Sequence, residues 1–237
     1  MIPVALSGMG AVTPLGNQVG ECLDRLSRGE VAPVCELPAP HAARPAFYHP
    51  VPAGAADAIG RRMARIRRSS PITYYSVTAG LAALEDAGEE VTPTGLPPER
   101  AARTAVIFAI CSGGVQYTRR FYEKIQAEGP SGASPILFPE TVYNAPASHL
   151  SATLGINGPS YTVVGDGSVG FSALRFAGEV LGTNPSLEQC VVVGAEEADW
   201  ILWEGYAAWR LLSREPCVRL HQSPPAGMLL SEGATAL

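Results

Sequence analysis

Residues 158–170 have the sequence Gly158-Pro159-Ser160-Tyr161-Thr162-Val163-Val164-Gly165-Asp166-Gly167-Ser168-Val169-Gly170. This pattern predicts a β-strand that passes through a tight glycine-rich turn into a buried helix. Such a turn is typical of a nucleophile elbow, which holds one residue at its apex against the positive end of the following helix. The apex residue here is Gly167, which has no side chain. The sequence therefore predicts the architecture of a catalytic turn without its reactive atom.

The same turn allows a second interpretation, in which Ser168 is the nucleophile of a hydrolase and Asp166 assists it. A serine needs a base within hydrogen-bond reach, normally a histidine. No motif places any of the four histidines of the chain near this turn. We therefore expect Asp166 and Ser168 to cap the following helix, a role that both residue types favour.

The composition is that of an ordinary globular protein. The chain has 237 residues, 46% of them hydrophobic, and a net charge of −5, which argues against a general nucleic-acid binder. Its five cysteines are an odd number without CxxC spacing, so they predict neither a disulfide framework nor a zinc site, and no cofactor is implied. The apolar runs are too short to span a bilayer and the start lacks a signal peptide's basic region, so we expect a cytoplasmic protein.

Alternating strand and helix patterns predict a single α/β domain over residues 1–237. A proline-rich stretch, residues 32–60, is expected to be an irregular surface excursion. The predicted strands are 2–6, 104–110, 161–164 and 189–193, followed by a closing hairpin of 228–230 and 234–237; the predicted helices are 18–28, 70–87, 117–126, 142–154 and 171–181.

Two groups of apolar side chains are expected to pack against other parts of the protein or against a partner. The loop before Pro139 carries three adjacent apolar residues, Ile136, Leu137 and Phe138, which need something to pack against. Trp200, Trp203 and Tyr206 are spaced to lie along one helical stripe, and together with Trp209 they are candidates to cover the helix after the elbow.

Taken together, these residues resemble the N-terminal half of the β-ketoacyl synthases, which have the thiolase fold. The resemblance implies one half of that fold, with a mixed five-stranded sheet and helices on both faces. The matching segments are Ser7–Gly16, Ala82–Gly88, Ser134–Pro139, Asn144 with Ala147 and Ser148, Gly155–Val163, Val193–Ala198 and Ser231–Ala234.

The chain departs from this family at the position that matters most for catalysis. In the synthases the elbow carries a cysteine that takes the acyl group as a thioester, and the matching residue here is Gly167. The family's two catalytic histidines and its lysine come from a C-terminal half to which nothing here corresponds. The resemblance therefore implies no condensing activity. In lacking that cysteine, the chain is similar to the chain-length factors of type II polyketide synthases, and most similar to the short cysteine-less subunits of aryl polyene pathways.

This resemblance also implies a partner, an active ketosynthase with which the chain forms a heterodimer. The interface would be the sheet-edge strand made of Tyr161, Thr162, Val163 and Val164. The loop residues Ile136, Leu137 and Phe138 would reach the partner's acyl tunnel and limit the length of the growing chain. A basic group, Arg61, Arg62, Arg65, Arg67 and Arg68, is either a solvated helix end or a docking patch for an acidic acyl carrier protein.

Two alternatives remain open at this stage. The chain could be a homodimeric module that binds an acyl group or an acyl carrier protein, or it could be a truncated piece of a longer protein. The face of helix 168–181 that would meet the second half of a full-length relative needs other cover. Either the stretches 32–60 and 200–225 cover it, or a partner does.

Overall fold

The computed structural model describes residues 4–55, 66, 69–216 and 223–237. Its strands are β1 (Gly10–Val12), β2 (Cys35–Glu36), β3 (Phe47–His49), β4 (Thr104–Ile110), β5 (Ser160–Val164), β6 (Gln189–Glu196), β7 (Leu230–Ser231) and β8 (Gly233–Ala236). Its α-helices are α1 (Val19–Ser27), α3 (Pro71–Asp86), α4 (Pro98–Ala102), α5 (Val115–Glu128), α6 (Ala145–Leu154), α7 (Val169–Thr183) and α8 (Trp200–Ala208), with short 3-10 helices η2 (Gly129–Gly132) and η3 (Phe138–Thr141).

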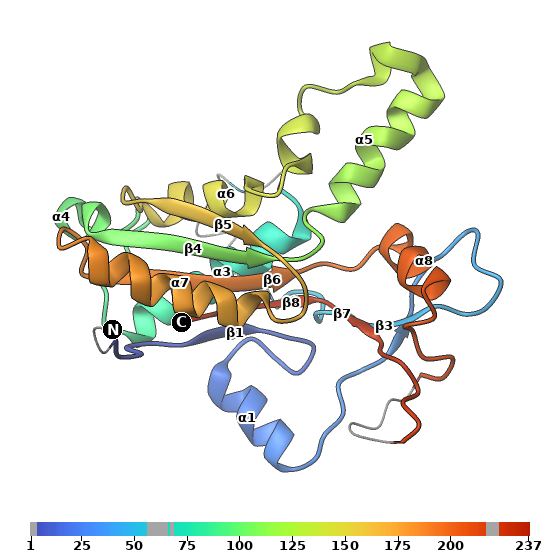
Figure 1. Ribbon diagram of the computed structural model, residues 1–237, viewed down its shortest axis with the longest axis horizontal. Helices are drawn as coiled ribbons and strands as arrows, with labels where there is room; N and C mark the ends of the chain where they lie inside the picture. Colours follow the sequence, from blue (N-terminus) through green and yellow to red (C-terminus); the bar gives the residue numbers. More distant parts are fainter. Residues whose placement is uncertain (1–3, 56–65, 67–68, 217–222) are drawn as a thin grey trace.

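Within the described residues the main sheet has five strands in the order β1-β8-β6-β4-β5. β4 lies parallel to both β5 and β6, whereas β8 is antiparallel to β6 and to β1. The sheet is therefore mixed, as expected. β5 pairs with β4 alone, so the strand that enters the elbow lies at an edge of the sheet (Figure 1).

Helices cover both faces of this sheet, which confirms the predicted layers (Figure 1). The alternation of side chains along β4 explains why. Val106, Phe108 and Ile110 point into a core shared with α3 and α6, whereas Ala105, Ile107 and Ala109 point into a core shared with α7. All seven β4 residues are buried, as expected for a central strand covered on both sides.

β1 lies later in the chain than the strand predicted for residues 2–6. It begins at Gly10, beyond the end of the predicted strand, and residues 4–9 are irregular. Gly10 permits β1 to approach α3 closely, because a Cβ at this position would overlap the carbonyl oxygen of Ala79. Gly8 and Gly10 therefore allow close packing of this part of the chain on α3.

The stretch 32–60 is not wholly irregular, and the predicted closing hairpin is wrong. β2 and β3 of this stretch form a second, three-stranded sheet with β7, whereas β8 belongs to the main sheet. Consecutive strands β7 and β8 therefore lie in different sheets, with Glu232 at the crossing point. Glu232 accepts hydrogen bonds from the backbone of Ala198 (3.3 Å) and Val51 (3.2 Å), which fix the chain as it changes sheets.

The proposed local cover for α7 is also wrong. Trp203 is buried, but it packs with Leu37, Ala46 and Leu230 in a separate cluster beside the small sheet. Trp209 is 71% exposed and Phe171, on the outer face of α7, is 79% exposed. The aromatic residues of α8 thus bind the 32–55 region instead of α7, and the outer face of α7 carries exposed apolar side chains.

α5 extends away from the sheet and the chain returns beside it through η2 to η3 (Figure 1). We call the segment from Val115 to Thr141 the arm. None of the helices in the described ranges is long and apolar enough to cross a membrane.

Candidate functional site

The elbow forms where it was predicted. β5 ends at Val164, and α7 begins at Val169 with Ser168 as its N-terminal cap position. Gly167 lies between them and is exposed. A Cβ built on Gly167 would meet no atom within 4 Å, so the site has room for a side chain that the sequence does not supply.

Asp166 occupies the helix end where a catalytic elbow would stabilise an anion. Its carboxylate accepts hydrogen bonds from the backbone N–H of Ser168 (2.9 Å) and from the Ser168 hydroxyl (2.7 Å). The Ser168 hydroxyl, followed by its backbone N–H, holds the pKa of Asp166 below its usual range. A fixed negative charge next to position 167 opposes a developing oxyanion or thiolate there.

Among the described residues no histidine contacts Ser168, so the hydrolase interpretation lacks its usual base. The Ser168 hydroxyl donates to Asp166 and makes no capping bond to α7, and the Asp166 carboxylate binds only Ser168, so neither side chain caps α7 as expected. The histidines within the described ranges have other neighbours: His41 lies against Trp200, His49 against Pro33 and His149 against Glu140. His221 lies outside the described residues.

Cys111 is a neighbour of the elbow that the sequence did not single out. Its thiol donates to the carbonyl oxygen of Asp166 (3.2 Å), and its backbone N–H donates to the carboxylate of Glu196. Burial, reinforced by the Glu196 charge, raises the pKa of Cys111 to about 11. Because the thiolate is the reactive form, Cys111 is a poor substitute for the missing nucleophile at neutral pH.

We expect Gly167→Cys to introduce a thiol of ordinary or low reactivity. The open space admits the side chain, but the Asp166 carboxylate raises the pKa of a neighbouring thiol and offsets the helix end. At neutral pH, alkylation of the introduced thiol, followed by peptide mass spectrometry, should be no faster than alkylation of the exposed Cys35.

Adding Asp166→Asn is the matched control, since asparagine keeps the acceptor for Ser168 and removes the charge. The double variant should react about threefold faster than Gly167→Cys alone, because about one unit of thiol pKa raises the thiolate fraction about tenfold and lowers the nucleophilicity of the thiolate about threefold. Rapid alkylation of the introduced thiol with Asp166 in place would contradict this account of the elbow.

A hollow lies beside the elbow, between one flank of α7 and the main sheet. It has a volume of about 240 Å³ and is lined by Gly167, Gly170, Phe171 and Leu174, together with residues of β4, β6 and the chain end. A second hollow of about 700 Å³ lies further along α7, against residues 4–7. The elbow therefore opens onto an apolar surface rather than into a closed active-site cavity.

The predicted interface residues lie on the edge strand β5. Tyr161 and Val164 are exposed by 40% and 51%, and Thr162 and Val163 are half-buried. The Tyr161 ring packs edge-on against Phe176 of α7, with 5.1 Å between ring centroids. The outer edge of β5 has no strand beside it within the described part of the chain.

The predicted gate residues lie on the arm. Ile136 is 67% exposed, Phe138 is 56% exposed and Leu137 is half-buried. The Phe138 ring contacts that of Phe121 on α5, with 5.8 Å between centroids, and Phe121 is itself buried. The contact with Phe121 thus holds residues 136–138 in place on the arm, while the side chains of Ile136 and Phe138 remain largely exposed.

The structure does not test the basic group. Arg61, Arg62, Arg65, Arg67 and Arg68 all lie outside the described residues. Among the residues that are described, no cluster of three or more histidine, cysteine, aspartate or glutamate side chains is arranged to hold a metal ion.

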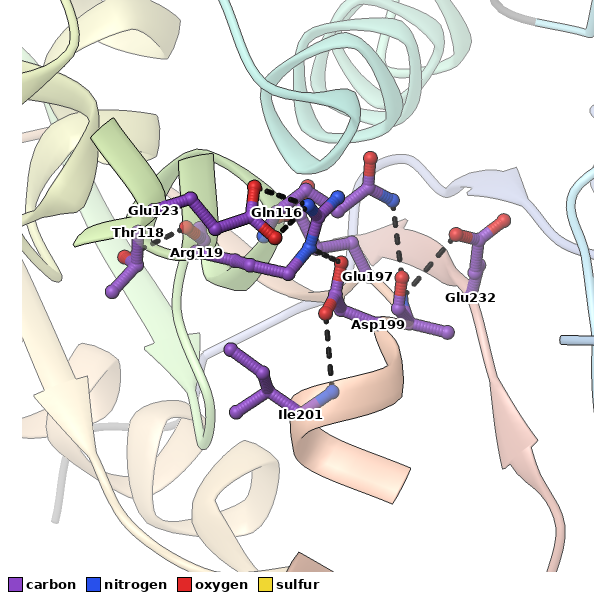
Figure 2. A network of polar contacts seen from close by, with 10 residues as sticks. Gln116, Thr118, Arg119, Glu123, Glu197, Asp199, Ile201 and Glu232 are labelled. Carbon is purple, nitrogen blue, oxygen red and sulfur yellow. Dashed lines mark hydrogen bonds and ion pairs between the residues drawn. The ribbon is translucent and has the colours of Figure 1, made fainter. Parts of the chain in front are cut away.

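A network of buried carboxylates lies at the carboxyl end of β6, and the sequence did not predict it (Figure 2). Glu197 is 1% exposed, and its carboxylate accepts the backbone N–H of Ile72 (3.0 Å) and of Gln116 (2.8 Å). Asp199 caps α8 through Ile201 and pairs with Arg119 of α5 at 2.8 Å. In the sequence, Glu197 and Asp199 are simply two acidic residues close together. Nothing in the sequence indicates that they are buried, and their burial is what marks the network.

Comparison with known proteins identifies the family. The chain matches the β-ketoacyl synthase N-terminal domain over residues 1–237, and it belongs to that family. The chain as a whole is not cysteine-less, since it has five cysteines; the residue without a thiol is the one at the elbow.

The relatives include synthases that are longer than this chain. The 3-oxoacyl-[acyl-carrier-protein] synthase 2 of Coxiella burnetii is 25% identical over 245 residues, which cover 99% of this chain and 56% of that protein. The enzyme of the same name from Vibrio harveyi is 26% identical over 89% of this chain and 49% of its own length. The chain thus spans about half the length of these relatives.

Solved structures show the same fold. A β-ketoacyl synthase from Burkholderia phymatum matches all of this chain and 58% of its own, with a TM-score of 0.79 and 22% identity. The ishigamide ketosynthase/chain length factor matches 98% of this chain and 60% of its own, with a TM-score of 0.73 and 19% identity. A type II polyketide ketosynthase in complex with its acyl carrier protein matches 98% of this chain and 60% of its own, with a TM-score of 0.70 and 18% identity.

Proposed function

We propose that this chain is a non-catalytic ketosynthase homologue that acts as a chain-length-factor-like partner of an active β-ketoacyl-acyl-carrier-protein synthase. It would stabilise that enzyme and shape its acyl tunnel in the cytoplasm, in type II polyketide or fatty-acid-type biosynthesis of the aryl polyene kind. The observation that carries the proposal is the elbow, where Gly167 faces open space and Asp166 holds a negative charge at the helix end. The turn of a condensing enzyme's elbow is kept, while the thiol that would take the acyl group is missing.

The open edge of β5 supports pairing with a partner. An edge strand with unpaired backbone groups and no charged side chain facing outward is a template for another strand. The strand Ser160–Val164 carries no charged residue. A ketosynthase subunit that presents the equivalent strand would extend the sheet across the interface.

The arm supports a role in the partner's tunnel. Its exposed apolar side chains, with those just after it, include Tyr122, Ile136, Phe138, Val142 and Tyr143. A surface of this kind on an extended segment is more typical of a contact site than of a free surface. Among the similar structures, one is a ketosynthase/chain length factor and another is a ketosynthase with its acyl carrier protein.

Co-expression with a candidate ketosynthase tests the proposal directly. We expect the tagged chain to purify in a stable complex with an untagged synthase that carries an intact cysteine and two histidines. Condensing activity should require both chains and should be lost when the cysteine of the synthase is replaced by alanine. The chain alone should show no activity, with or without Gly167→Cys.

A different result would favour another function. A homodimer that binds acyl carrier protein with no synthase present would favour the homodimeric binding module. Condensing activity of the purified chain by itself would overturn the proposal.

A further inference from the structure

The arm leaves the fold and returns to it at one place, where Gly114 precedes α5 and Glu140 lies in η3. A Cβ built on Gly114 would lie 2.7 Å from the carbonyl oxygen of Glu140, so the two ends of the arm approach each other too closely for a side chain at position 114. The gate residues Ile136 and Phe138 come just before Glu140 on the returning end. The contacts that hold this end therefore also position the gate.

We call residues 134–141 the gate segment; it is a compact turn held by its own backbone bonds. The N–H groups of Leu137 (3.2 Å) and Phe138 (3.0 Å) donate to the carbonyl oxygen of Ser134. The N–H of Glu140 donates to the carbonyl oxygen of Leu137 (3.0 Å). Because these bonds tie the segment together, a tether at Glu140 also restrains the gate residues.

Glu140 supplies such a tether. It is 7% exposed, and each oxygen of its carboxylate accepts a hydrogen bond from a different part of the fold. One oxygen accepts the backbone N–H of Ser70 at the start of α3 (3.3 Å), and the other accepts from Nε2 of His149 on α6 (2.6 Å). Both contacts suit a carboxylate, which can only accept. A buried carboxylate with both oxygens bound is costly to displace, so Glu140 holds the gate segment in one position.

The bond to Ser70 takes the place of a local helix cap. In a capping box, a Glu or Gln three positions after the cap residue binds the backbone N–H of that residue. In α3 the cap residue is Ser70 and the residue three positions later is Thr73, so the N–H of Ser70 is bound by Glu140 instead, 70 residues further along the chain. The positive end of α3 also favours a carboxylate. The start of α3 is therefore a binding site for the returning end of the arm.

The bond to His149 connects the gate segment to the proposed interface. α6 packs on the same core as α3 and contacts β5, whose outer edge is the proposed contact strand (Figure 1). Glu140 is thus bound both to a core helix and to the helix beside the interface strand. A gate that enters a partner's tunnel must be placed relative to the interface, and these two bonds provide that placement.

We propose that Glu140 is a positioning residue that, through Ser70 and His149, fixes the gate segment relative to β5 and thereby sharpens the product length that the partner's tunnel allows. The placement of the segment concerns this chain alone. Its consequence for product length rests on the function proposed above.

Hydrogen exchange on the full chain tests the placement. In Glu140→Ala, peptides that cover residues 134–145 should lose about tenfold protection, the effect of losing one or two hydrogen bonds. Peptides from β4 and α7 should keep their wild-type protection, because neither element is bound to Glu140. Glu128→Ala is the matched control, since it removes an exposed carboxylate from the end of α5, and it should change neither region.

A second variant, His149→Ala, separates the two bonds of Glu140. It removes one donor and leaves the bond to Ser70, so it should loosen the gate segment less than Glu140→Ala does. Because both variants act through one carboxylate, combining them should loosen the segment no more than Glu140→Ala alone. Effects that add in the double variant would show that His149 does not act through Glu140, which would overturn its part in the inference.

In the complex with a ketosynthase, a loosened gate differs from a smaller gate in its effect on the products. Glu140→Ala keeps the bulk of Ile136 and Phe138 but lets them close the tunnel at more than one depth. The product distribution should therefore broaden by at least one extension unit towards both shorter and longer chains. A merely structural defect would lower the amount of complex and leave the distribution of product lengths unchanged.

Two results of the exchange experiment would overturn the inference. One is wild-type protection of residues 134–145 in a folded Glu140→Ala variant. The other is an equal loss of protection in α7, which would make Glu140 a general stabiliser of the fold. If Glu140→Ala does not fold, His149→Ala decides the question, because His149 is only half-buried and its replacement must still loosen the gate segment.

The product experiment separates this inference from the proposed function. If alanine at the gate residues changes product length and a loosened Glu140→Ala variant does not, the role of Glu140 in product length is overturned. If neither variant changes product length, the proposed gate fails, while the exchange result still decides whether Glu140 places the segment.

Discussion

Replacing Thr162 with proline is expected to weaken binding of the ketosynthase partner by at least about tenfold, the effect of losing one or two interface hydrogen bonds. The reason lies in the direction of the backbone groups of β5. The carbonyl oxygen of Pro159 accepts from Val106, and the N–H of Gly165 donates to Ile110. Because backbone groups alternate in direction along a strand, odd-numbered residues face β4 and even-numbered residues face the open edge.

The N–H of Thr162 therefore points away from β4, to the edge where a partner strand would pair. Proline at this position removes an edge donor and places its ring in the path of the partner, yet it breaks no bond between β5 and β4. The fold should survive, as circular dichroism and thermal melting of the isolated chain can confirm.

Thr162→Val is the matched control, since valine suits a strand and keeps the backbone N–H. Affinity for the partner is measured by surface plasmon resonance with the co-expressed synthase. Equal affinity of Thr162→Pro and Thr162→Val, with both variants folded, would show that β5 is not the contact strand.

Much of the fold follows from local patterns. β4 has the predicted bounds, because a continuous apolar run of seven residues can be buried on both faces of a sheet. The elbow, β5 and α7 follow from the glycine-rich turn between a β-branched run and an apolar helix. In these segments the spacing of apolar residues along the chain matches the side chains that are buried, so secondary structure can be predicted from the local sequence.

The failures arise where long-range pairing overrides local pattern. Strands β7 and β8, read as a hairpin, are separated by one residue but belong to two sheets, since Leu230 pairs beside Tyr48 and Ala236 beside Gly10. Trp203 packs on residues far earlier in the chain, at 37 and 46. Partners at such separations leave no signal in the spacing of the residues themselves.

One part of the candidate site can likewise be predicted from the sequence, and another part cannot. The empty apex at Gly167 can be read from the sequence, because a missing side chain is a property of one position. The role of Asp166 at the helix end and the burial of Glu197 between two helices cannot be read in this way. Each depends on where a neighbouring backbone amide points after folding.

Removing the bulk of the gate is expected to lengthen the product. In the double variant Ile136→Ala with Phe138→Ala, the two most exposed side chains of the loop lose most of their volume. If these side chains close the end of the partner's tunnel, the space they leave admits a longer acyl chain, so the product distribution shifts by at least one extension unit. The products are released from the carrier protein and measured by liquid chromatography with mass spectrometry.

The structure also predicts what this variant leaves intact. It leaves the ion pair of Arg119 with Asp199 at the base of the arm in place, but it removes the ring that contacts Phe121, so circular dichroism has to show that the arm stays folded. Ile201→Ala, an exposed apolar residue on α8, serves as the control and should leave product length unchanged. An unchanged distribution in a complex that still forms would mean that the loop is not the gate. The exposed side chains of the arm would then have to serve the interface alone, because bulk that limits a tunnel cannot be removed without effect on what the tunnel holds.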